Sequence, residues 1–124
     1  MFTARLLAGA LAALMLTQTV VPAVAHAKLL SAVPKADGMA MPMPASLRLN
    51  FSEVPELAFS RVSVTGPDNQ PVAAGKPGAA ADDPNALVVP LPANLPEGTY
   101  TVEWTAVTDD GHKTSGSYTF EAMQ

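Results

Sequence analysis

Tyr100-Thr101-Val102-Glu103-Trp104-Thr105-Ala106 is the stretch of this sequence that decides the fold. Its apolar and aromatic side chains occupy every second position, and threonine or glutamate occupies the positions between them. This period of two is typical of a β-strand that buries one face and exposes the other. Because no segment after residue 25 shows a sustained helical period, we predict an all-β protein.

Shorter strand patterns lie on both sides of this stretch. Leu47, Leu49 and Phe51 alternate with polar residues, and Tyr118 and Phe120 share one face of the last expected strand. Further strands are expected over residues 28–33, 58–65 and 87–91. Pro90 favours a sheet edge for residues 87–91, because proline cannot donate a hydrogen bond to a neighbouring strand.

The segments between these strands are rich in turn-forming residues. Gly66-Pro67-Asp68-Asn69 predicts a turn. Residues 71–85 predict a long surface connection with one short edge strand, and residues 92–98 a loop. About seven short strands in about 100 residues indicate an immunoglobulin-like sandwich of two sheets. We therefore expect a single small domain with Trp104 in its core.

The first 25 residues are typical of a secretory signal peptide. Arg5 precedes an apolar run over residues 6–16, and Ala23 and Ala25 occupy the small-residue positions of a cleavage site. The run is shorter than the roughly 20 residues of a membrane span, and a retained anchor is the alternative. Cleavage after Ala25 would leave residues 26–124 as an exported domain that does not insert into a membrane.

Charge and cysteine content exclude several classes of function. Removing Arg5 lowers Lys plus Arg from 7 to 6 against 11 acidic residues, so the formal net charge of residues 26–124 is −5. An acidic domain without a basic patch argues against nucleic-acid partners. The sequence has no cysteine, which excludes thiolate metal sites. Any metal must bind nitrogen, carboxylate oxygen or thioether sulfur.

His26 would become the N-terminus of the exported protein. Its α-amine, with a reference pKa of about 7.7–8.0, and its imidazole could then chelate one metal ion. An incidental terminal histidine in solvent is the alternative interpretation.

The only other histidine is His112, in Asp109-Asp110-Gly111-His112. In an extended segment, residues two apart point to the same side, so we expect Asp110 rather than Asp109 to converge with His112. A polar turn is the alternative, since Asp-Gly is a common turn pair. Amine, imidazole and carboxylate donors suit a tetragonal Cu(II) site, and zinc, which prefers a tetrahedron, is the natural competitor.

Met39, Met41 and Met43 form a second candidate cluster. Each of the last two precedes a proline, which favours an extended backbone and would place the three thioethers on one side. Thioether sulfur selects Cu(I), whereas pliable apolar filler is the alternative role. No arrangement of nucleophile and base is evident, so we do not expect an enzyme.

The sequence over residues 26–124 resembles the CopC family of periplasmic copper-binding and copper-resistance proteins. The resemblance is carried by the segments His26-Ala27-Lys28-Leu29-Leu30-Ser31, Leu49-Asn50-Phe51-Ser52-Glu53, Gly98-Thr99-Tyr100 and Asp110-Gly111-His112, with Pro34, Val102, Trp104, Gly116 and Phe120. It implies a Greek-key β-sandwich with a Cu(II) site formed by the amine and imidazole of His26, Asp110 and His112.

The resemblance also implies a role as copper carrier or reservoir in the periplasm, beside an inner-membrane copper importer or another periplasmic copper protein. We expect a monomer. Family members with a Cu(I) site carry a methionine-rich loop in mid-domain, but residues 66–85 here contain no methionine. The family's Cu(I) site therefore cannot be transferred by position to Met39, Met41 and Met43.

Two other functions compete with the carrier role. A terminal histidine that binds copper with a second histidine is also the design of copper mono-oxygenases that cleave polysaccharides. Such an enzyme needs open copper positions and a broad substrate face, whereas this sequence offers Asp110 as a further ligand and only one Trp and two Tyr. The third possibility is a metal-free immunoglobulin-like interaction module.

Overall fold

The computed structural model describes residues 13, 15, 17 and 26–124, and apart from those first three positions the expected signal peptide lies outside the described residues. Within the described part no helix is long and apolar enough to cross a membrane. The described residues form eight strands: β1 (Leu29–Val33), β2 (Met39–Ala40), β3 (Ser46–Phe51), β4 (Arg61–Thr65), β5 (Gly78–Ala79), β6 (Ala86–Pro90), β7 (Gly98–Val107) and β8 (Lys113–Ala122).

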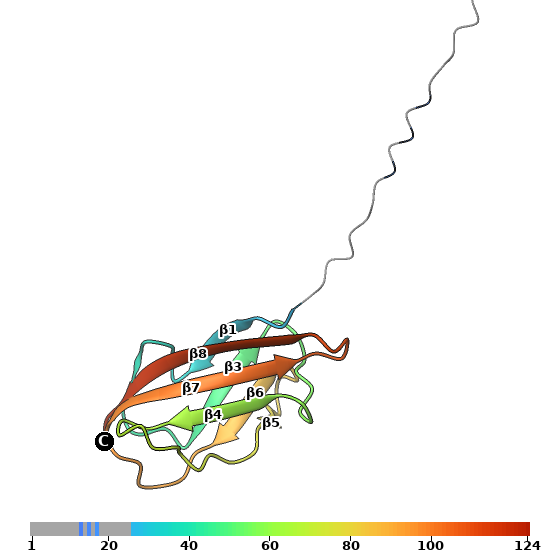
Figure 1. The fold of residues 1–124 in the computed structure, drawn as a ribbon. Helices are drawn as coiled ribbons and strands as arrows, with labels where there is room; N and C mark the ends of the chain where they lie inside the picture. Colours follow the sequence, from blue (N-terminus) through green and yellow to red (C-terminus); the bar gives the residue numbers. More distant parts are fainter. Residues whose placement is uncertain (1–12, 14, 16, 18–25) are drawn as a thin grey trace, which may run out of the picture.

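The strands form two packed sheets, as the alternating sequence pattern predicts (Figure 1). One sheet has the order β1-β3-β6-β5, and the other has the order β2-β8-β7-β4. All pairings are antiparallel except the short parallel contact between β2 and β8. The expected all-β Greek-key sandwich is confirmed, and the stretch that decides the fold lies in β7, which pairs along its whole length with β8.

The core forms where the inward faces of the two sheets meet. Tyr100 stacks on Phe120, and Trp104 meets Phe51 edge to face. The Tyr100 hydroxyl donates a hydrogen bond to the carbonyl of Pro96, an arrangement typical of immunoglobulin-like sandwiches. Gly116 lies opposite Trp104 on β8, where an added Cβ would come within 2.6 Å of the indole ring. Only glycine therefore fits beside this Trp104 conformation.

Two local expectations were wrong, and one short strand was missed. β4 begins at Arg61 rather than at residue 58, because the N–H groups of Phe59 and Ser60 both bond to the carbonyl of Glu56 and close a turn. β6 is an interior strand, paired with β3 on one side and β5 on the other. Proline is tolerated there because β5 pairs only with Leu87 and Val88. Pro90 lies beyond the end of that pairing. β2 was not expected as a strand.

Candidate metal centre

The connection between β7 and β8 holds Asp110 and His112 in a tight turn. The Gly111 N–H donates to the Thr108 carbonyl (2.9 Å), and the Thr108 N–H donates to the His112 carbonyl (3.1 Å). Gly111 has φ +82°, a conformation that glycine adopts at little cost. The segment is therefore not the extended chain expected from the sequence. Asp110 and His112 come together because the chain turns.

The Asp110 carboxylate is fixed by three hydrogen bonds. Oδ1 accepts from the Thr108 hydroxyl and from the His112 N–H (3.1 Å), and Oδ2 lies 2.8 Å from His112 Nδ1. The bond from Thr108, followed by those from His112, lowers the pKa of Asp110 to about 2. The carboxylate is thus charged near neutral pH.

Thr108 is a site residue that the sequence did not single out. It is buried, with 3% of its surface exposed, and its hydroxyl contacts the carboxylate that the candidate site uses. A signal was present, because a threonine two residues before an aspartate in a turn can bond that side chain. Without the turn geometry, however, Thr108 is one of several threonines near the end of β7.

The other half of the site is the segment that leads into β1. Ala27 is buried, its carbonyl accepts a hydrogen bond from the Thr114 hydroxyl (2.7 Å), and the Lys28 N–H donates to the Ser52 hydroxyl (2.8 Å). These anchors place the His26 ring 5.1 Å from the His112 ring, centroid to centroid, at an interplanar angle of 88°. Figure 1 shows the chain entering the domain at the end that carries the β7–β8 turn.

The donor atoms at this end suit a metal ion bound near the surface. Two donors that each lie about 2 Å from one ion at a right angle are about 2.8 Å apart, which is the separation of Asp110 Oδ2 and His112 Nδ1. Both side chains are 44% exposed, so an ion can reach them from solvent. The pair therefore offers two adjacent positions of a tetragonal site.

The full chain nevertheless holds only part of such a site. Among the described residues, no three His, Cys, Asp or Glu side chains are gathered closely enough to hold an ion. The His26 ring stands beside the pair without completing it, and in the full chain the His26 nitrogen is bonded to Ala25. The amine that cleavage would free at His26 is the further nitrogen donor that the sequence predicts for this site.

The remaining sequence candidates lie elsewhere. Asp109 lines a separate shallow depression with Glu53, Val54, Glu56 and Asn85. Met39 and Met41 are 62% and 69% exposed, whereas Met43 packs against the core. The structure therefore separates Asp109 from Asp110 and Met43 from the other two methionines.

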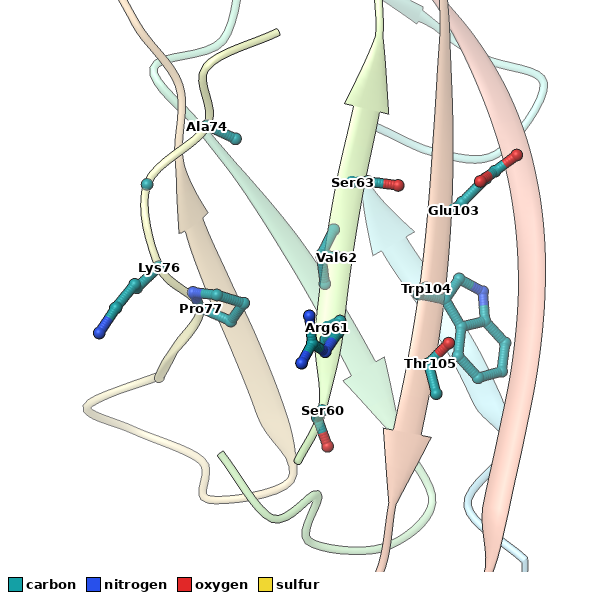
Figure 2. A pocket seen from close by; sticks show the side chains of 11 residues that line it. Ser60, Arg61, Val62, Ser63, Ala74, Lys76, Pro77, Glu103, Trp104 and Thr105 are labelled. Atoms are coloured by element: carbon teal, nitrogen blue, oxygen red, sulfur yellow. The ribbon is translucent and has the colours of Figure 1, made fainter. Parts of the chain in front are cut away.

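A surface depression of about 480 Å³ lies apart from the histidines. Figure 2 shows it beside β4, β7 and the segment of Ala74 to Pro77. Its lining brings together charged side chains of both signs, from Arg61, Lys76 and Glu103. It contains no histidine, carboxylate pair or nucleophile with a base. The candidate metal centre lies instead at the surface, where the Asp110 and His112 side chains are 44% exposed.

Known proteins resemble this chain over most of its length. The CopC domain model matches residues 29–123. "Protein YobA" of Escherichia coli K12 is 44% identical over 119 residues, covering 95% of each chain. "Copper resistance protein C" of Escherichia coli is 38% identical over 79% of this chain and 82% of its own.

Solved structures agree with these sequence matches. The crystal structure of PcoC, a methionine-rich copper resistance protein from Escherichia coli, has a TM-score of 0.71 at 40% identity, over 80% of this chain and 100% of its own. CopC from Methylosinus trichosporium OB3b has a TM-score of 0.71 at 29% identity, over 78% and 93%. The resemblance noted in the sequence is confirmed, and the chain belongs to the CopC family.

Proposed function

We propose that the protein is a periplasmic Cu(II) carrier or reservoir without catalytic activity. The observation that carries the proposal is the meeting of the His26 ring with the hydrogen-bonded pair of Asp110 and His112 at one end of the sandwich. Relatives named copper resistance protein C support copper as the cargo. Nitrogen and oxygen donors favour Cu(II) among first-row divalent ions.

Each residue of the proposed site has a distinct task. The His26 amine and imidazole form a chelate on a single residue. His112 adds a second imidazole, and Asp110 adds negative charge through Oδ2, because Oδ1 is already held by Thr108 and the His112 backbone. A copper ion bound by both side chains would replace the contact between Asp110 Oδ2 and His112 Nδ1.

Processing and location complete the proposal. Cleavage between Ala25 and His26 creates the chelating terminus and releases residues 26–124 as the copper-binding domain. An exported carrier with a solvent-exposed site can pass its ion to an inner-membrane importer or to another periplasmic copper protein. We infer that it acts as a monomer, because all donors come from one chain.

Electron paramagnetic resonance of the protein that begins at His26, titrated with Cu(II), tests this function. The expected spectrum is that of one tetragonal Cu(II) per chain with nitrogen donors. Absence of uptake above background, measured by isothermal titration calorimetry, would identify a metal-free module instead. Reductant-dependent peroxide formation or sugar oxidation by the copper-loaded protein would identify an oxidase.

A further inference from the structure

Three large apolar side chains are exposed on the connection between β3 and β4, and we call them the apolar turn. Phe59 is 66% exposed, Val54 51% and Leu57 47%. In the same segment Pro55 is buried and Ser60 is only 6% exposed, so smaller side chains are buried while larger apolar ones face solvent. Apolar side chains scattered singly over a surface are normal, but a concentration of them marks an interaction site.

Backbone hydrogen bonds hold this segment in a fixed conformation. The N–H groups of Phe59 and Ser60 donate to the Glu56 carbonyl (3.1 and 2.9 Å). The Glu56 N–H donates to the Val107 carbonyl (2.7 Å), and the Val107 N–H donates to the Ser60 hydroxyl (3.1 Å). Because the backbone is bonded in this way, the apolar side chains are presented on a preformed surface, which lowers the entropy cost of docking.

The same bonds place the apolar turn beside the candidate metal centre. Val107 lies three residues before Asp110. Where the connection begins, the Ser52 N–H donates to the carbonyl of Lys28 (2.9 Å), which follows His26 by two residues. Figure 1 shows the connection between β3 and β4 at the end of the sandwich that carries the β7–β8 turn. The apolar turn is thus linked through the backbone to both halves of the site.

The border of the apolar turn is acidic. Glu53, Glu56 and Asp109 line one depression with Val54 and Asn85, and among the described residues its lining has no lysine or arginine. Two copies of this face would bring like charges together, and carboxylates are repelled from an anionic membrane surface. Charge complementarity therefore favours a protein partner whose own apolar patch is bordered by lysine and arginine.

We propose that Val54, Leu57 and Phe59 are the docking surface for such a basic-bordered protein, which exchanges copper with the histidine site. The exchange of copper rests on the proposed function, whereas the docking surface rests on exposure, rigidity and charge. Docking here would bring the partner's own ligands next to the exposed side chains of Asp110 and His112. A few well-packed side chains commonly carry most of the binding energy of an interface, and Phe59, as the most exposed of the three, is the expected anchor.

Site-specific photo-crosslinking in cells that export the protein identifies the partner. Benzoylphenylalanine replaces Phe59, and in the matched control it replaces Gln70, which is exposed beyond the far end of β4. The protein captured from position 59 is identified by mass spectrometry and purified. The cross-linked peptide should come from an apolar surface bordered by lysine and arginine.

Isothermal titration calorimetry then measures how tightly the purified partner binds wild type and variants. Replacing Leu57 and Phe59 together by Ser should weaken binding at least about thirtyfold, the loss that truncating one dominant interface residue commonly causes. Val33→Ser removes a side chain of β1 that is 60% exposed and should bind as wild type does. Glu56→Lys should slow association and reduce its dependence on NaCl concentration.

Parallel measurements separate docking from copper binding. The double serine variant should keep the melting temperature of wild type and its Cu(II) affinity. If wild type takes up no Cu(II) but its partner still requires Leu57 and Phe59, the docking surface is confirmed and the proposed function alone fails.

Four results would overturn the docking surface. Two are capture at position 59 no stronger than at position 70, and equal affinity of the partner for wild type and the double serine variant. The third is binding to vesicles of phosphatidylethanolamine and phosphatidylglycerol that the double variant loses, which would assign the face to a membrane. The fourth is self-association in sedimentation equilibrium that the double variant loses, which would assign it to a second copy.

Discussion

The two halves of the histidine site are built in different ways. The Asp110–His112 half is complete once the domain folds, because the β7–β8 turn and Thr108 fix the carboxylate against the imidazole. The His26 half is only placed by folding: Thr114 and Ser52 anchor the backbone after it, and its amine exists only after cleavage. In the proposed site, folding prepares one half and cleavage would complete the other.

This division has a chemical consequence for export. Under the proposed function, the uncleaved chain would offer an aspartate–histidine pair with a nearby second ring, and cleavage would add a two-nitrogen chelate at the same place. We therefore expect copper affinity to rise on cleavage.

Among single substitutions, removing the His112 imidazole should have the largest effect on Cu(II) affinity. Replacing His112 by Ala should weaken Cu(II) binding more than about 100-fold, since loss of outer contacts alone commonly costs 10–100-fold. Isothermal titration calorimetry measures the change. Asp109→Asn is the matched control, because its side chain lies in a different depression, and should bind as wild type does.

The same variant separates binding from folding. His112 is 44% exposed, so apo His112→Ala should stay within about 0.5 kcal/mol of wild type in urea unfolding, as surface substitutions usually do. Collapse of the apo variant in a circular-dichroism melt would show that His112 supports the fold instead of the ion.

Weakening the backbone anchor of the His26 half should have an intermediate effect on Cu(II) affinity. Thr114→Val removes the hydroxyl that bonds the Ala27 carbonyl and should weaken Cu(II) binding about tenfold, because the His26 chelate is less well positioned. In a protein whose His26 amine is acetylated, the same substitution should have almost no effect on Cu(II) affinity. An equal effect in both chains would mean that Thr114 acts through general stability.

Removing the Thr108 hydroxyl that bonds Asp110 should have the smallest effect on Cu(II) affinity at neutral pH. Thr108→Val removes the largest cause of the lowered pKa, so the pKa of Asp110 should rise from about 2 toward the reference value of about 3.9. Carboxyl chemical shifts followed by NMR against pH measure this. Asp110 stays charged at pH 7 in both proteins, so copper affinity there should fall less than about tenfold.

The sign of the accompanying stability change follows from the lowered pKa. The bonds to ionised Asp110 stabilise the folded state above the ordinary carboxyl pKa, and this contribution is lost as pH falls toward about 2. In Thr108→Val the smaller remaining contribution should disappear at a higher pH. An unchanged pKa of Asp110 in the variant would contradict the role assigned to Thr108.

Sequence periodicity predicted the sandwich well because burial on one face leaves a direct mark. Tyr100, Val102 and Trp104 had to alternate with polar residues, and the structure places them in β7 as expected. The order in which strands pair within a sheet has no such pattern in the sequence, so the interior position of β6 was missed. The short β2 was missed too, since two residues carry no period.

The candidate site was predicted by residue type but not by geometry. Histidine is rare here, so His26 and His112 stood out in the sequence. The turn, the Thr108 bond and the anchors from Ser52 and Thr114 join residues distant in sequence or depend on backbone angles. The sequence pattern also grouped Met43 with Met39 and Met41, whereas only Met43 of these three packs against the core.

The most direct test of the account compares Cu(II) binding by two proteins that differ only in one acetyl group. Both begin at His26, one with a free amine and the other with that amine acetylated, and mass spectrometry confirms both N-termini. The protein with the free amine should bind Cu(II) more than about 100-fold more tightly, since acetylation removes the amine from its donors. Equal affinities and identical resonance spectra would show that the terminal amine does not bind copper, which would contradict the central claim.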